Sequence, residues 1–365
     1  MKAVLRIMMV IIIVFLIGFY SGPSVQENDV LENDIGDLPR KEENTNAPNE
    51  ISNTVMRPKS GLSVFVGESV ESFKAHWGEP DRVDPGHYEL DWLIYNRGAE
   101  GYMQIAIKDS VVSAAFALGE DVDVSPFYIG QSIDEIYRFT IISSEIVVED
   151  DNGVYQFELS EEDLHSRLLV PFGDIFAQLF IDQFTGTILG VHYMGKEALI
   201  SQRPYELVYP GDLPQIPHIE NQRAIDAANE NQLFDMTNVI RMQRDVESLE
   251  WEEEVAQVAR GHSKNMHEEE FFSNESPTEG TLADRLEETE RSYQEVAENI
   301  ATNYSHAPAV IHAWMNSPGH RKTLLQDGFT HLGIGVYNLY FTQDFIKQKQ
   351  NNDRRETIEQ NAPTH

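Results

Sequence analysis

Cysteine is absent from all 365 residues of this chain. Without thiols the protein can form no disulfide, no thiolate metal site and no cysteine nucleophile, so each domain depends on its own apolar core. Basic residues are scarce as well, because 27 Lys and Arg stand against 61 Asp and Glu, which gives a net charge of −34. Nucleic acids and anionic lipids attract clustered basic side chains. We therefore expect no nucleic-acid partner and no membrane contact beyond the N-terminal segment.

The chain also has little apolar sequence of membrane-spanning length, which is roughly 20 residues. Its N-terminal apolar run covers only residues 7–20 and follows Lys2 and Arg6, the pattern of an export signal. The next residues, Phe19-Tyr20-Ser21-Gly22-Pro23, lack the small-residue pair that signal peptidase prefers, which favours a retained anchor over cleavage. Residues 1–21 are thus predicted to be a signal peptide or membrane anchor. The protein is expected to be extracytoplasmic, membrane-anchored or secreted, on a Gram-positive-type cell surface.

Three further segments are too polar or too rich in proline to fold by themselves. Residues 22–60 consist mainly of Asn, Glu, Asp and Pro and are predicted to form a disordered acidic tether. Residues 201–221 contain four spaced prolines, which indicate an inter-domain linker. Residues 347–365 are predicted to be a disordered polar tail. Two folded regions remain, 61–200 and 222–346.

Residues 61–200 contain an internal duplication. Gly67-Glu68-Ser69-Val70 recurs as Gly130-Gln131-Ser132-Ile133, and in each copy the serine can cap a helix. The pattern predicts two units, each a helix followed by an antiparallel sheet. No group of residues in this region has catalytic spacing, so we expect a structural or partner-binding role. The expected strands include residues 88–94, 103–107, 111–118, 175–181 and 187–193.

Residues 222–346 show helix patterns followed by two strands. Val255, Ala259, His262 and Met266 share one helix face, so His262 points where the apolar side chains point. Ser317 and Pro318 predict the start of a short helix with His320 in its first turn, where the helix dipole favours a neutral imidazole. Strands are expected at 332–337 and 339–345. The region is predicted to be an α-β-α sandwich, so the fold class of the whole chain is α+β.

Five motifs in this region follow one another in a fixed order and resemble those of the CAP superfamily, which contains cysteine-rich secretory proteins, antigen 5 and plant pathogenesis-related proteins. The resemblance covers about residues 230–346 and is supported by Asn238, Arg241, Asp284, Arg285 and Leu286. The duplicated region resembles the associated domain that precedes certain bacterial CAP domains. The motifs are Gly261-His262-Ser263-Lys264-Asn265-Met266, Ala297-Glu298-Asn299-Ile300-Ala301, Trp314-Met315-Asn316-Ser317-Pro318-Gly319-His320-Arg321, Gly333-Ile334-Gly335-Val336 and Tyr340-Phe341-Thr342-Gln343-Asp344-Phe345.

The resemblance implies a cleft of two histidines and acidic residues that binds zinc or another divalent cation in some members. By position His262 matches the first family histidine, Glu298 the family glutamate and His320 the second histidine. Two neutral imidazoles and one carboxylate could fill three positions on zinc and leave a fourth for water. Taken alone, His262 on an apolar face is more often a hydrogen-bonded core histidine than a ligand.

The chain departs from the family pattern at three positions. Ser317 stands where many eukaryotic members have a second glutamate, Asn274 where bacterial members often have a histidine, and Ala297 where glycine is usual. The missing glutamate weakens both metal binding and acid-base chemistry, and we assign no catalytic residue and no organic cofactor.

Three functions remain open from the sequence. The first is a non-catalytic protein that binds an unknown protein or cell-envelope ligand, with a cleft that could hold a divalent cation. The second is a metal-assisted hydrolase of envelope peptide or polymer. The third is a protein-binding regulator that acts through residues 61–200, with a merely structural CAP cleft.

Overall fold

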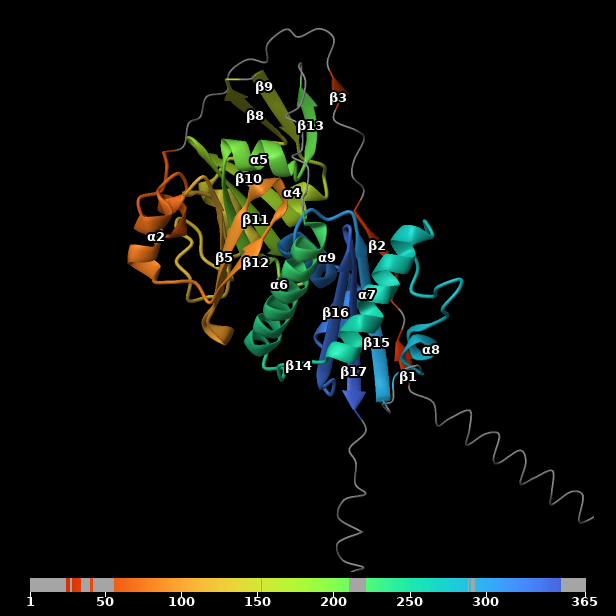
Figure 1. The fold of residues 1–365 in the computed structure, drawn as a ribbon. Coiled ribbons are helices and arrows are strands. Elements are labelled where there is room, and N and C mark those ends of the chain that lie inside the picture. Colours follow the sequence, from red (N-terminus) through yellow and green to blue (C-terminus); the bar gives the residue numbers. More distant parts are fainter. Residues whose placement is uncertain are drawn as a thin grey trace, which may run out of the picture.

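The computed structural model describes residues 24–26, 28–33, 40–41, 56–151, 153–209, 221–287, 289 and 293–348. Most of these residues form an N-terminal unit and a C-terminal unit that pack against each other (Figure 1). The apolar run at 7–20 lies outside the described residues. Among the helices that are described, none is long and apolar enough to cross a bilayer.

The duplicated region folds into one sheet rather than two. Helices α2 and α3 begin the two copies, and Ser69 and Ser132 cap them as predicted, accepting hydrogen bonds from Ser72 N at 3.2 Å and Glu135 N at 3.3 Å. Strands β7 and β12 pair antiparallel and join the copies into a seven-stranded sheet, in the order β10-β11-β12-β7-β6-β5-β4. The merger pairs two strands that would otherwise be exposed sheet edges. The elements are α2 (Val70–Trp77), β4 (Arg82–Pro85), β5 (Asp91–Asn96), β6 (Tyr102–Lys108), β7 (Val111–Leu118), α3 (Ile133–Phe139), β10 (Arg167–Phe172), β11 (Ile175–Asp182) and β12 (Thr187–Gly195).

The N-terminal unit also contains a four-stranded sheet in the order β3-β13-β9-β8. Two predicted boundaries are wrong here, because β3 lies within the expected tether and β13 lies within the expected linker. Both segments gain backbone partners that their composition could not reveal. The remaining elements are β3 (Arg40–Lys41), η1 (Leu62–Phe65), η2 (His87–Glu89), η3 (Gly98–Glu100), β8 (Glu145–Asp150), β9 (Gly153–Glu158), α4 (Asp163–Ser166), α5 (Lys196–Gln202) and β13 (Glu206–Tyr209).

The C-terminal unit is the predicted α-β-α sandwich. Its sheet has the order β1-β15-β17-β16-β14, and α7 packs directly on β16 and β17. Gly333 and Gly335 permit this approach, since a Cβ on either would lie within 2.3 Å of α7 backbone atoms. The elements are α6 (Gln222–Gln243), β14 (Glu250–Trp251), α7 (Glu253–Glu268), α8 (Leu282–Glu287), β15 (Tyr293–Thr302), α9 (Ala307–Asn316), α10 (Pro318–Leu324), β16 (His331–Tyr337) and β17 (Tyr340–Gln348), which extends into the predicted tail.

The two units share one apolar core across α6 and α9, which contact both sheets. Around this core, the turn that follows β11 meets the end of α9. Asp182 binds Arg244 at 2.5 Å and Arg321 at 3.0 Å, and Asn316 Nδ2 donates to Ile181 O at 2.9 Å. Arg321 of the Ser-Pro-Gly-His-Arg motif therefore holds the units together.

Part of the predicted tether belongs to the C-terminal sheet. Strands β1 (Ser24–Gln26) and β2 (Leu31–Glu32) both pair in parallel with β15 (Figure 1). The expectation of disorder over 22–60 is therefore wrong for these residues. The reason is that β15 has an open edge, and backbone pairing with it satisfies amide and carbonyl groups on both strands.

Candidate functional site

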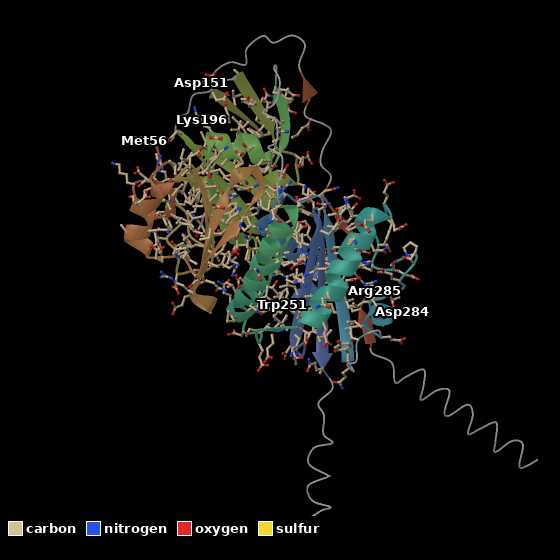
Figure 2. The ribbon with its side chains drawn as sticks, viewed as in Figure 1. Met56, Asp151, Lys196, Trp251, Asp284 and Arg285 are labelled. Atoms are coloured by element: carbon tan, nitrogen blue, oxygen red, sulfur yellow. The ribbon has the colours of Figure 1, made fainter. Side chains whose placement is uncertain are left out.

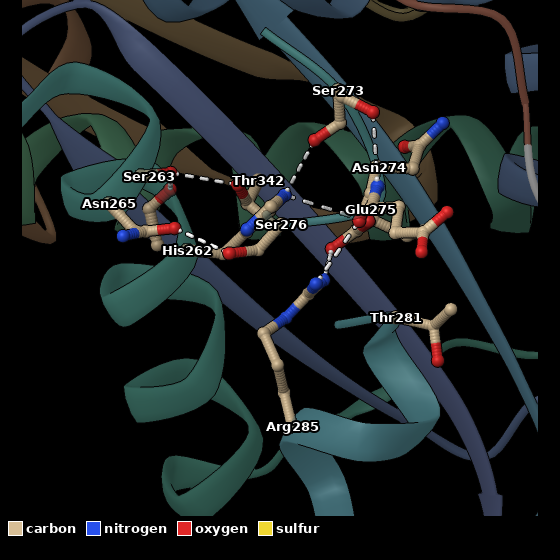
Figure 3. Close-up of polar contacts among 12 residues, drawn as sticks. His262, Ser263, Asn265, Ser273, Asn274, Glu275, Ser276, Thr281, Arg285 and Thr342 are labelled. Atoms are coloured by element: carbon tan, nitrogen blue, oxygen red, sulfur yellow. Dashed lines mark hydrogen bonds and ion pairs between the residues drawn. The ribbon is translucent and has the colours of Figure 1, made fainter. Parts of the chain in front are cut away.

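His262 lies on α7 with its side chain fully buried, as the helical pattern predicted. Burial and, to a smaller extent, the nearby Arg285 charge lower its pKa to about 3, while the bond to Ser273 acts in the other direction. The imidazole is therefore neutral at pH 7. Its Nε2 lies 3.0 Å from Ser273 O, and because a carbonyl oxygen only accepts, Nε2 carries the hydrogen (Figure 3).

Glu298 on β15 is held by an arginine from α8. Arg285 Nη2 donates to Glu298 Oε2, while its Nη1 donates to Gly280 O at 2.9 Å and Asn274 O at 3.1 Å. His262 Nε2 lies farther away, 3.9 Å from Glu298 Oε1. Arg285 lies on the side of the C-terminal unit away from the N-terminal unit (Figure 2). Its side chain points from α8 toward His262 of α7 (Figure 3). The positive partner of the Glu298 carboxylate is thus a side chain of the protein itself.

Asp344 is the third acidic group of this region. It is the direct cross-strand neighbour of Glu298 in the β15–β17 pairing and is completely buried. Burial raises the pKa of Asp344 well above its usual range, and the Glu298 charge adds to this effect while Arg285 opposes it. The buried environment of Asp344 therefore favours its neutral carboxylic acid form, beside the Glu298 carboxyl group and its guanidinium partner Arg285.

His320 lies in the first turn of α10, as predicted, and is fully buried. Ser317 does not cap this helix through its side chain; its Oγ instead bonds His320 Nδ1 at 2.7 Å. Burial lowers the pKa of His320 to about 4, although the charge of Asp29 raises it slightly. The backbone oxygen of His320 accepts from Asn299 Nδ2 at 3.3 Å. Asn299 follows Glu298 in β15 and points to the opposite face of the sheet.

The three predicted metal ligands do not come together as one set. His262 and Glu298 are neighbours, whereas no hydrogen bond or ion pair among the described residues connects His320 to either. Nowhere in the described part of the chain are three or more His, Asp or Glu side chains grouped so that they could hold a metal ion. As they stand, these residues do not fit a divalent cation, because Arg285 occupies Glu298 and the hydrogen of His262 Nε2 points at Ser273. A zinc site remains a prediction that requires Arg285 to leave Glu298.

Sequence reasoning missed the roles of two residues at this site. Arg285 was noted only as a supporting position, and Asp344 only as part of a strand motif. The sequence held a signal for Asp344, since an acidic residue among apolar strand neighbours is unusual. Only the sheet register shows that it faces Glu298.

Comparisons with known proteins agree with this fold. The CAP-associated N-terminal family matches residues 66–205, and the cysteine-rich secretory protein family matches residues 234–347. Uncharacterized membrane protein YlbC of Bacillus subtilis (strain 168) is 39% identical over 357 residues, which span 95% of this chain and 100% of that protein. Uncharacterized protein YkwD of the same strain is 35% identical over 122 residues, 33% of this chain and 48% of YkwD.

Two solved structures are similar over most of the chain. An extracellular protein containing a SCP domain from Bacillus anthracis str. Ames has a TM-score of 0.75 and 38% identity, with 85% of this chain and 100% of that chain covered. A cysteine-rich secretory protein (SAV1118) from Staphylococcus aureus subsp. aureus Mu50 has a TM-score of 0.74 and 27% identity, with 88% and 100% covered. The chain belongs to the cysteine-rich secretory protein (CAP) family, with a CAP-associated N-terminal domain before its CAP domain.

Proposed function

We propose that this chain is a non-catalytic CAP-domain protein that works outside the cytoplasmic membrane and binds a protein partner or envelope ligand through its CAP domain. The basic start and apolar run at 7–20 support an extracytoplasmic location. Two relatives support it as well, because one is named a membrane protein and the other an extracellular protein.

The observation that carries this proposal is the closed ion pair between Arg285 and Glu298. A hydrolase needs a general base or a metal with an open position. Here the Glu298 carboxylate accepts from Arg285, and the raised pKa of buried Asp344 favours its neutral form. The hydrogen on His262 Nε2 points at a backbone carbonyl. The arrangement favours a rigid binding surface over bond cleavage, and the hydrolase alternative requires this pair to open first.

A second candidate function is partner binding by the CAP-associated domain. Large apolar side chains are exposed at the end of α3, where Phe139 and Ile141 are each 78% accessible. Val147 and Val154 on the adjoining β8–β9 hairpin are exposed too. Large apolar side chains exposed on a surface are candidates for a protein contact.

One retention experiment separates these candidates. Full-length protein is immobilised and exposed, with and without zinc, to protein and polymer fractions of a Gram-positive envelope. The masses of the retained components are then measured by mass spectrometry. We expect a component retained with unchanged mass. Gly319 lies on α10 close to Asn28, whose side chain bonds to β15. We expect Gly319→Ala to weaken retention roughly tenfold, about 1.4 kcal/mol, because its Cβ would lie 2.9 Å from Asn28 Oδ1 and would alter this edge of the CAP domain.

The matched control is Gly261→Ala, where a Cβ would meet nothing within 4 Å and retention should be unchanged. Cleavage of the retained component that disappears in His262→Ala would contradict the proposal and favour the hydrolase. Loss of retention in Phe139→Asp with full retention in Gly319→Ala would move the function to the CAP-associated domain.

A further inference from the structure

The edge of β15 is covered by a short N-terminal segment, described at residues 24–26 and 28–33 and called the N-terminal strap here. Its two strands run parallel to β15, with Gln26 opposite Ala297 and Leu31 opposite Ala301 (Figure 1). Asn33 N extends the pairing to Thr302 O at 3.0 Å. Gln26 and Leu31 are five positions apart, whereas their partners Ala297 and Ala301 are four positions apart. The two short strands therefore do not continue one another in a single regular register. The strap is paired with β15 near both ends.

Asn28, which lies between the two short strands, is the main side-chain anchor of the strap. Its Nδ2 lies 2.7 Å from Asn299 Oδ1, 2.8 Å from Thr323 Oγ1 and 3.1 Å from Glu298 O. Its backbone oxygen accepts from Asn274 Nδ2. A single asparagine thus bridges β15, α10 and the loop after α7.

Gly319 on α10 leaves room for the side chain of this anchor. A Cβ at Gly319 would lie 2.9 Å from Asn28 Oδ1, and the next nearest atoms belong to the same Asn28 side chain. The first turn of α10 therefore leaves room for an asparagine side chain. The space beside Gly319 is filled by the asparagine side chain of the strap.

Near the strap, two side chains keep a buried polar atom that the strap does not bond. In the described structure His320 Nε2 and Asn274 Oδ1 are buried and have no hydrogen-bond partner. The backbone oxygen of Ile300 lies close enough to His320 to raise its pKa. Asp29 lies close enough for its charge to affect His320, yet Asp29 and Val30 remain exposed to solvent. Buried polar atoms without partners are costly, so a ligand that reaches them would bind better than the strap does.

We propose that the β15 edge is a binding site for an extended polypeptide segment of a partner protein, and that the N-terminal strap is its intramolecular occupant. The partner segment adds a parallel strand to β15, places an asparagine where Asn28 lies and an acidic residue beside His320. Main-chain pairing supplies affinity and the asparagine pocket supplies specificity, as in other cases of strand addition. The proposal rests on the proposed function, because it names the ligand class of the same CAP domain.

The strap and a partner compete for one edge, which gives a direct test. A fluorescent peptide with the sequence of residues 24–33 is titrated into the full-length chain, into Asn28→Ala and into Gly319→Ala, and hydrogen exchange of the strap is followed by mass spectrometry. Intramolecular attachment gives the strap a high effective concentration, so the wild-type chain should bind the peptide weakly. In Asn28→Ala we expect the strap to exchange faster and the peptide to bind at least tenfold more tightly.

The other samples make the result specific. Gly319→Ala should also release its strap but gain no peptide affinity, because its Cβ obstructs the asparagine of any occupant. Gly261→Ala should behave as wild type, and a scrambled peptide should bind none of the chains. Continued protection of the strap in Asn28→Ala, or a released strap without peptide binding, would overturn the proposal.

Two further outcomes are informative. Dimerisation of Asn28→Ala through exchanged straps, without peptide binding, would identify a second copy as the occupant and overturn the assignment to a separate partner. Failure here would remove the reason to expect weaker retention in Gly319→Ala, but it would leave the main result of the retention experiment, an envelope component retained with unchanged mass by the wild-type chain, to stand or fall by itself. The two proposals can therefore fail separately.

Discussion

Replacing Arg285 by alanine is expected to lower the free energy of unfolding by about 3–5 kcal/mol, the usual effect of removing one partner of a buried ion pair. The side chains of Arg285 and Glu298 are only 4% and 3% exposed. Without the guanidinium, the carboxylate of Glu298 would remain buried beside Asp344. Urea unfolding at pH 7 measures the change.

Two comparisons identify the cause of this loss. Lys264→Ala removes a half-exposed pair with Glu268 and should change stability by less than about 0.5 kcal/mol. Glu298→Gln added to Arg285→Ala should recover part of the loss, because the uncompensated charge is then gone. A change below about 1 kcal/mol for Arg285→Ala, or no recovery in the double variant, would show that the pair is not the internal charge balance of this site.

Asp182→Ala should destabilise the contact between the two domains by about 2–3 kcal/mol at pH 7. This value lies below that of a fully buried pair because Arg244 and Arg321 are 26% and 14% exposed. Burial alone would raise the pKa of Asp182, but Arg321 and Arg244 together lower it below its usual value.

The sign of the pH dependence follows from that lowered pKa. The stabilisation by Asp182 is fully present above the unfolded pKa of roughly 3.9 and is lost as pH falls through the lower folded pKa. Wild type and Asp182→Ala should therefore differ most at neutral pH and converge as the pH falls through the lowered folded pKa in urea titrations. Asp174→Ala, which removes a carboxylate that is 66% exposed, is the control and should show little change at either pH. A difference that persists unchanged in acid would contradict the role of the ionised Asp182.

Local sequence signals predicted much of this structure. Helical spacing placed His262 on the buried face of α7, and the Ser-Pro-Gly-His run placed His320 in the first turn of α10. The repeated glycine and serine residues before α2 and α3 revealed the duplication. Such features depend on residues that are close in the sequence, within one or two helical turns, so they can be predicted from the sequence alone.

The features that depend on pairing between distant segments could not be predicted. Nothing in the duplicated sequence shows that β7 pairs with β12 and turns two units into one sheet. Asn28 lies 271 positions from Asn299 and in a segment whose composition indicates disorder. Arg285 could be recognised from its motif, but only the orientation of α8 directs it to Glu298.

The central claim is that the CAP domain presents a binding surface in which Arg285, rather than a metal ion, balances the charge of Glu298. Zinc titrated by calorimetry into the full-length chain near neutral pH tests this most directly, together with His262→Ala and His320→Ala. The account predicts no stoichiometric zinc binding that depends on these histidines. Stoichiometric binding in the wild-type chain that is lost in both variants would contradict it and would establish the metal cleft that the family resemblance implies.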